Sequence, residues 1–133
     1  MSFHAAVWMD HEHARVFHLD RESFDESVLK MPKHQLASRA KGRDSHHRGE
    51  SHDQKEYFES IAKAIGDAQE ILLMGPGTAK LQFLKHAHKH EPKLEARVVG
   101  VESADHPTDG QILAHARKYF RAKDHMLGTN AGL

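Results

Sequence analysis

The stretch Glu70–His90, EILLMGPGTAKLQFLKHAHKH, decides the fold of this chain. Its continuous apolar run, Ile71–Met74, is typical of a strand that is buried on both faces. The Gly-Pro-Gly turn at 75–77 ends that strand, and Thr78 can then cap a helix. This helix is expected to present four residues along one side: Leu81, Leu84, Ala87 and His88. Strand, turn and helix make half of a βαβ crossover, and a second buried strand at Arg97–Val101 completes it.

The rest of the chain supplies three more strands and two more helices. Three short stretches with strand character predict an antiparallel meander: Phe3–Met9, Ala14–Leu19 and Ser27–Met31. The helix that follows ends near Ile65 and buries Tyr57, Phe58, Ile61, Ala62 and Ile65. The last helix starts at a capping box of Thr108 and Gln111 and ends near Arg121. This order predicts an α/β, RNase H-like fold, in which a mixed five-stranded sheet of order 3-2-1-4-5 carries helices on both faces.

Composition narrows the classes of function. A chain of 133 residues is one ordinary domain, and its 19 Lys and Arg balance its 19 Asp and Glu. Electrostatic recognition must therefore come from local clustering. The absence of cysteine excludes disulfides and thiol catalysis. Neither a leader-like start nor a bilayer-length apolar run is seen, so we expect a soluble cytoplasmic protein with no membrane partner and no required cofactor.

Residues 32–52 are expected to form a long, basic, mobile loop. Structureless loops of this length are uncommon inside compact domains and tend to carry function. Five cations could neutralise phosphates there: Lys33, Arg39, Lys41, Arg43 and Arg48. The loop therefore predicts RNA contact, with a solvated loop that has no partner as the alternative. Residues 123–133 are predicted to be a loose tail.

The 14 histidines raise the question of a metal site. His86 and His90 are four residues apart on one helical face, a spacing that suits two ligands of one ion. No set supplies a complete ligand group by spacing, and the alternative is that these histidines are core or solvent-exposed residues, with adventitious zinc or nickel binding.

A ligand pocket is predicted where the 75–77 turn meets the loop DHPTDG, residues 105–110. The glycine turn leaves helix amides exposed for an anion, although its spacing matches neither a phosphate loop nor a dinucleotide fingerprint. Both segments follow strands, and open α/β sheets bind ligands at that end. Alternatively, the loop 105–110 has a purely structural role and only starts the helix that follows it. The pocket residues would be Gly75, Gly77, Lys80, His106, Thr108 and Asp109.

An RNase H-like sheet also suggests a metal nuclease, which needs converging carboxylates. The candidates are Asp10, Glu56 or Glu59, and Glu102. The central strand, however, ends in Met-Gly-Pro with no acid where that chemistry needs one.

Three stretches carry a family resemblance: VWMDHEHARVF, ILLMGPGTAKLQF and VVGVESADHPTDGQILAHARKYF. Over Val7–Met31 and Tyr57–Phe120 the chain resembles a bacterial family, sometimes labelled translational machinery proteins. That family is related to the middle domain of archaeal and eukaryotic peptide-chain release factors. The resemblance implies a ribosome or tRNA as partner and a role in translation or ribosome rescue.

In release factors, the loop between the third strand and the first helix carries a Gly-Gly-Gln tip that promotes hydrolysis of peptidyl-tRNA. The equivalent segment, Lys33–His52, contains no Gly-Gly-Gln, so no catalytic residue carries over. The resemblance thus favours a translation-associated RNA-binding protein. The alternatives are a peptidyl-tRNA ester hydrolase with a replaced loop chemistry and a histidine-rich metal-binding or stress protein.

Overall fold

The computed structural model describes residues 3–20, 23–32 and 52–126. Five strands form one sheet: β1 (His4–Met9), β2 (His13–Leu19), β3 (Phe24–Lys30), β4 (Glu70–Gly75) and β5 (Val98–Ser103). Their spatial order is β3-β2-β1-β4-β5. β1, β2 and β3 pair antiparallel, whereas β1, β4 and β5 run parallel. The predicted mixed sheet and its strand order are confirmed.

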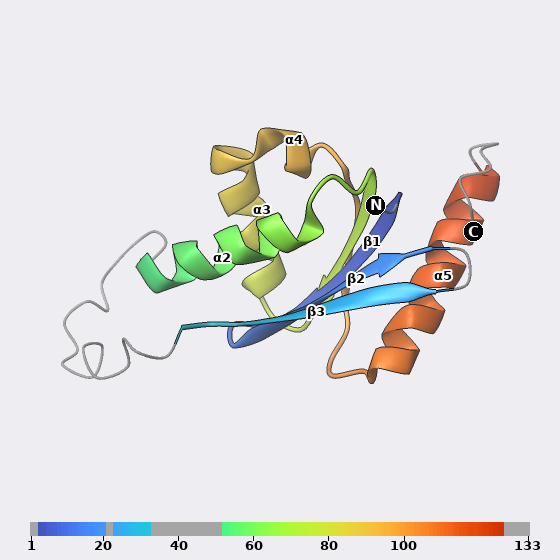
Figure 1. Cartoon of the computed structure of the whole chain (residues 1–133), viewed down its shortest axis with the longest axis horizontal. Coiled ribbons are helices and arrows are strands. Elements are labelled where there is room, and N and C mark those ends of the chain that lie inside the picture. Colours follow the sequence, from blue (N-terminus) through green and yellow to red (C-terminus); the bar gives the residue numbers. More distant parts are fainter. Residues whose placement is uncertain (1–2, 21–22, 33–51, 127–133) are drawn as a thin grey trace.

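Helices cover both faces of this sheet, as predicted (Figure 1). One face carries α2 (His52–Ile65), α3 (Ala79–His90) and the short α4 (Pro92–Glu95), and the other carries α5 (Asp109–Met126). The middle strand β1 is buried at every position. Its alternate residues serve different cores, since Val7 packs on the α2 side and Trp8 on the α5 side.

The outer strands differ from expectation because they are edge strands. β3 begins at Phe24, three residues before the predicted start, because the antiparallel pairing with β2 continues to Leu19–Phe24. Residues 24–26, which precede the predicted strand, are thus part of the exposed edge strand. β5 was expected to be buried, but as the opposite edge it is only partly covered, and Val101 is 38% exposed.

The buried face of α3 also differs from the prediction. Phe83, His86 and Ala87 point into the core, while Leu81 is 52% exposed and His88 lies on the surface. The large ring of Phe83 packs edge-on against Phe58 of α2, and this contact sets the rotation of the helix.

Three helix boundaries also need correction. Pro92 starts the short helix α4, an additional element that was not predicted. α5 continues to Met126, five residues beyond the predicted end near Arg121, so residues 123–126 are helical rather than tail. α2 begins at His52, which was expected to belong to the loop.

Candidate functional site

The parallel strands β1, β4 and β5 end at the same edge of the sheet, which we call the carboxyl edge. Three connections meet there: residues 10–12 after β1, the 75–78 turn after β4 and residues 104–108 after β5. The backbone N–H of Ala104 donates to the carbonyl of Gly75 at 3.2 Å. The indole N–H of Trp8 in turn donates to the carbonyl of Ala104, also at 3.2 Å. Bonds from one connection to the next therefore hold this edge together.

The 75–78 turn is built on two glycines and a buried lysine. Gly75 has φ of 151°, and a Cβ there would collide with the carbonyl of Met9 at the end of β1. Gly77 has φ of 59° and open space around it. Lys80 is only 5% exposed, and its ammonium donates to the carbonyl of Gly77 at 2.7 Å. The lysine thus closes its own turn.

Asp10 organises the connection after β1. Its Oδ1 accepts the backbone N–H groups of Glu12 at 2.8 Å and His13 at 2.9 Å. The ring of His106 approaches Oδ2 at 3.6 Å. Burial raises the pKa of Asp10, but the two backbone hydrogen bonds and the neighbouring His13 and His106 outweigh it and hold that pKa below its usual value. The carboxylate therefore serves a turn.

Trp8 packs beneath these residues. Its side chain is fully buried. The ring centroids of His13 and His106 each lie 5.2 Å from that of Trp8, and both rings are tilted against the indole. The guanidinium of Arg15 lies 4.8 Å from the indole centroid, within cation–π range. Arg15 also contacts Asp109 at 2.5 Å, so the Asp109 carboxylate is ion-paired.

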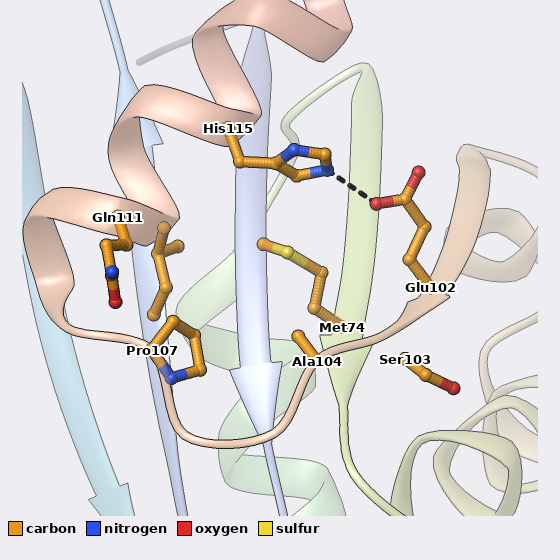
Figure 2. Close-up of a pocket in the computed structure, with 8 residues that line it drawn as sticks. Met74, Glu102, Ser103, Ala104, Pro107, Gln111 and His115 are labelled. Atoms are coloured by element: carbon orange, nitrogen blue, oxygen red, sulfur yellow. Dashed lines mark hydrogen bonds and ion pairs between the residues drawn. The ribbon is translucent and has the colours of Figure 1, made fainter.

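A cavity of about 270 Å³ opens between the ends of β4 and β5 and the first turns of α5 (Figure 2). Its lining residues are Met74, Glu102, Ser103, Ala104, Pro107, Gln111, Ile112 and His115. The Nε2 of His115 lies 2.6 Å from the Oε1 of Glu102, and this pair closes one side of the cavity (Figure 2).

The start of α5 confirms the predicted capping box. The Thr108 hydroxyl accepts the backbone N–H of Gln111 at 3.1 Å, and the Gln111 side-chain oxygen accepts the backbone N–H of Thr108 at 2.9 Å. By contrast, Thr78 stands at the N-cap of α3 without a side-chain capping bond, so that expected cap is wrong.

The six predicted pocket residues lie on the turn, helix start and loop of the carboxyl edge, yet none of them lines the cavity. Lys80 donates a hydrogen bond to the carbonyl of Gly77, and Asp109 is ion-paired with Arg15. The sequence pattern missed His115 because it lies one turn of α5 beyond the capping box. Glu102 was considered only as a nuclease carboxylate. The position of Glu102 at the end of a strand was the available signal.

The remaining predicted site residues are placed as follows. His86 is 2% exposed beside Phe58 and Phe83, and its ring centroid lies 4.8 Å from that of exposed His90. Among the residues that the structure describes, no group of three or more His, Asp or Glu is arranged to hold a metal ion. The predicted RNA-binding residues lie outside the described residues: Lys33, Arg39, Lys41, Arg43 and Arg48. In the described part of the chain, no helix has the length and apolar character needed to cross a membrane.

Comparison with known proteins identifies the fold. No family model matches the chain, and no curated protein matches its sequence. Solved structures do match. Pelota from Archaeoglobus fulgidus aligns with a TM-score of 0.59 and 14% identity over 86% of this chain. The archaeal translation termination factor aRF1 aligns with a TM-score of 0.56 and 14% identity over 94% of this chain.

Dom34 from S. cerevisiae aligns with a TM-score of 0.58 and 10% identity over 95% of this chain. Dom34 is described as a translation termination-like factor that takes part in RNA quality control and interacts with Hbs1. The chain spans 30% of the Pelota chain, 39% of aRF1 and 38% of Dom34. It therefore shares its fold with about a third of each of these release-factor-like proteins.

Proposed function

We propose that this chain acts in translation as an RNA-binding protein that contacts the ribosome or tRNA in the cytoplasm. The observation that carries the proposal is the fold, which three release-factor-like proteins share over 86% to 95% of this chain. aRF1 is an archaeal translation termination factor, and Dom34 is a translation termination-like factor. A common role in translation is the simplest account of a domain that recurs among them.

The charge pattern of the sequence supports RNA binding. Residues 33–51 join β3 to α2, the place where release factors carry their Gly-Gly-Gln loop. This segment holds five Lys and Arg against Asp44 and Glu50, in a chain whose charges balance overall. Because it contains no Gly-Gly-Gln, we assign it the binding of RNA phosphates rather than the family's hydrolytic step.

The test is binding of purified tRNA across a salt series. In one variant, Lys33, Arg39, Lys41, Arg43 and Arg48 are changed to Gln. The control variant carries the same change at five exposed lysines of α2, α3 and α4: Lys55, Lys63, Lys85, Lys89 and Lys93. Five lost phosphate contacts reduce the slope of log affinity against log salt by roughly 3 to 4.

We expect saturable binding by the intact protein, a shallower salt slope for the first variant and an unchanged slope for the control. Equal salt slopes for both variants would show that residues 33–51 do not contact the RNA phosphates. Absence of saturable binding by the intact protein, both to tRNA and to ribosomes, would overturn the proposed function.

A further inference from the structure

We propose that the cavity between β4, β5 and α5 binds one unstacked nucleobase of single-stranded RNA, with guanine preferred. This inference rests on the proposed RNA-binding function and specifies where a base would be read. Sequence-specific RNA recognition commonly takes a splayed-out base into a pocket and reads its edge by hydrogen bonds. The walls, polar groups and surrounding charge of this cavity suit such a ligand.

The walls of the cavity are largely apolar. Met74 comes from the end of β4, Ala104 and Pro107 from the loop after β5, and Ile112 from α5 (Figure 2). A thioether and a proline ring offer polarisable and flat surfaces to an aromatic ring. The volume of about 270 Å³ lies just below the range of roughly 300–1,000 Å³ typical of drug-sized ligands. The cavity is therefore suited to a single base.

Polar groups lie on two sides of the cavity, with Glu102 and His115 at one side and Gln111 at the other, and can read a base edge (Figure 2). Because a carboxylate only accepts hydrogen bonds, the Nε2 of His115 carries the proton in its 2.6 Å contact with Glu102. That contact uses one oxygen of Glu102 and holds the carboxylate, whose side chain is 37% exposed. The capping box takes the side-chain oxygen of Gln111, another lining residue, so its amide group offers a donor.

A fixed carboxylate selects bases by their N–H donors. Guanine presents an imino N–H and an exocyclic amino group side by side, and both are donors that a carboxylate can accept. Adenine lacks the imino donor, so it would leave the carboxylate of Glu102 poorly matched.

The helix that bears His115 also supplies positive charge for the flanking phosphates. Residues 110–123 of α5 contain Arg117, Lys118, Arg121 and Lys123 and no acidic residue. Lys118 and Arg121 are exposed, one and two turns along the helix from the cavity. A backbone that leaves a base in the cavity would therefore meet cations on the same helix.

Trp8 provides a built-in reporter for the cavity. It is the only tryptophan in the chain, and its indole N–H donates to the carbonyl of Ala104, which lines the cavity. The experiment is an NMR titration of the 15N-labelled full chain with GMP, AMP and a guanine-containing single-stranded RNA. We expect shifts of the Trp8 indole signal and of the amides of Glu102, Ala104 and His115, with GMP binding more tightly than AMP.

Two matched substitutions separate base reading from surface charge. Glu102→Gln removes the carboxylate of the cavity pair, whereas Glu95→Gln removes that of the surface pair between Glu95 and His88, which lie 3.0 Å apart. We expect Glu102→Gln to weaken binding of GMP and of the RNA roughly tenfold, and Glu95→Gln to leave both unchanged. The side chains of Glu102 and Glu95 are each 37% exposed, and the amide spectrum of each variant is compared with that of the parent to check that it folds.

RNA binding that leaves the Trp8 and Glu102 signals unmoved would overturn the base pocket while the proposed function stands. Equal effects of the two substitutions would also overturn it. If neither the nucleotides nor the RNA bind, and tRNA and ribosomes also fail to bind, both proposals fall together.

Discussion

Single residues hold the carboxyl edge in shape, and Gly75 is the most constrained of them. Substitution by alanine forces a Cβ onto the carbonyl of Met9 at a φ of 151°. We expect Gly75→Ala to lower the free energy of unfolding by more than about 2 kcal/mol. Gly77→Ala, at a φ of 59° with open space around it, should cost about 1 kcal/mol. Urea unfolding of both variants tests this ranking, and equal losses would contradict the close approach of β4 to β1.

The carboxylate of Asp10 predicts a pH dependence of stability. Because folding lowers the pKa of Asp10, its ionised form stabilises the fold above the unfolded pKa, and this contribution is lost as the pH falls through the folded pKa. We expect Asp10→Asn to be less stable than the parent at neutral pH. The difference should shrink as the pH falls below about 4.

A matched control for Asp10 is Asp105→Asn. The side chain of Asp105 is 92% exposed and contacts the same His106 at 3.0 Å. We expect this substitution to leave the pH profile of unfolding unchanged. A stability difference for Asp10→Asn that persists undiminished at low pH would show that its effect is steric rather than electrostatic.

At the scale of elements, two threonines at helix starts form a natural comparison. Thr108 and Gln111 exchange hydrogen bonds at the start of α5, whereas Thr78 makes no side-chain cap for α3. We expect Thr108→Ala to reduce the free energy of unfolding by about 1 kcal/mol. Thr78→Ala should change it by less than about 0.5 kcal/mol. Urea unfolding measures both, and a larger loss for Thr78→Ala would contradict the assigned caps.

Sequence patterns predicted the elements whose burial is complete and misplaced those at the edges. The apolar run of β4 and the inner face of α2 read directly as buried positions. The start of β3 was missed because an exposed edge strand carries polar residues such as Asp25 and Glu26. The face of α3 was misjudged because Leu81 is apolar yet exposed, while His86 is polar yet buried. Tertiary packing, rather than the polarity of the side chain, decides whether Leu81 and His86 are buried.

At the scale of the whole molecule, topology could be predicted because a meander followed by two right-handed crossovers leaves few arrangements. The carboxyl edge followed from that topology. The cavity did not, because its residues come from β4, β5, a loop and α5, and their convergence depends on how α5 packs over the sheet. The pairing of Glu102 with His115 has no local sequence signature.

We propose that this release-factor-like fold serves translation through RNA contact. The decisive experiment is co-sedimentation of the full chain with ribosomes across a salt series. We expect the intact protein to sediment with ribosomes at low salt and to be released steeply as salt rises. The variant neutralised at Lys33, Arg39, Lys41, Arg43 and Arg48 should need at least roughly tenfold more ribosomes, and the five-lysine control should behave as the parent. An intact protein that stays in the supernatant at every salt concentration would rule out ribosome binding.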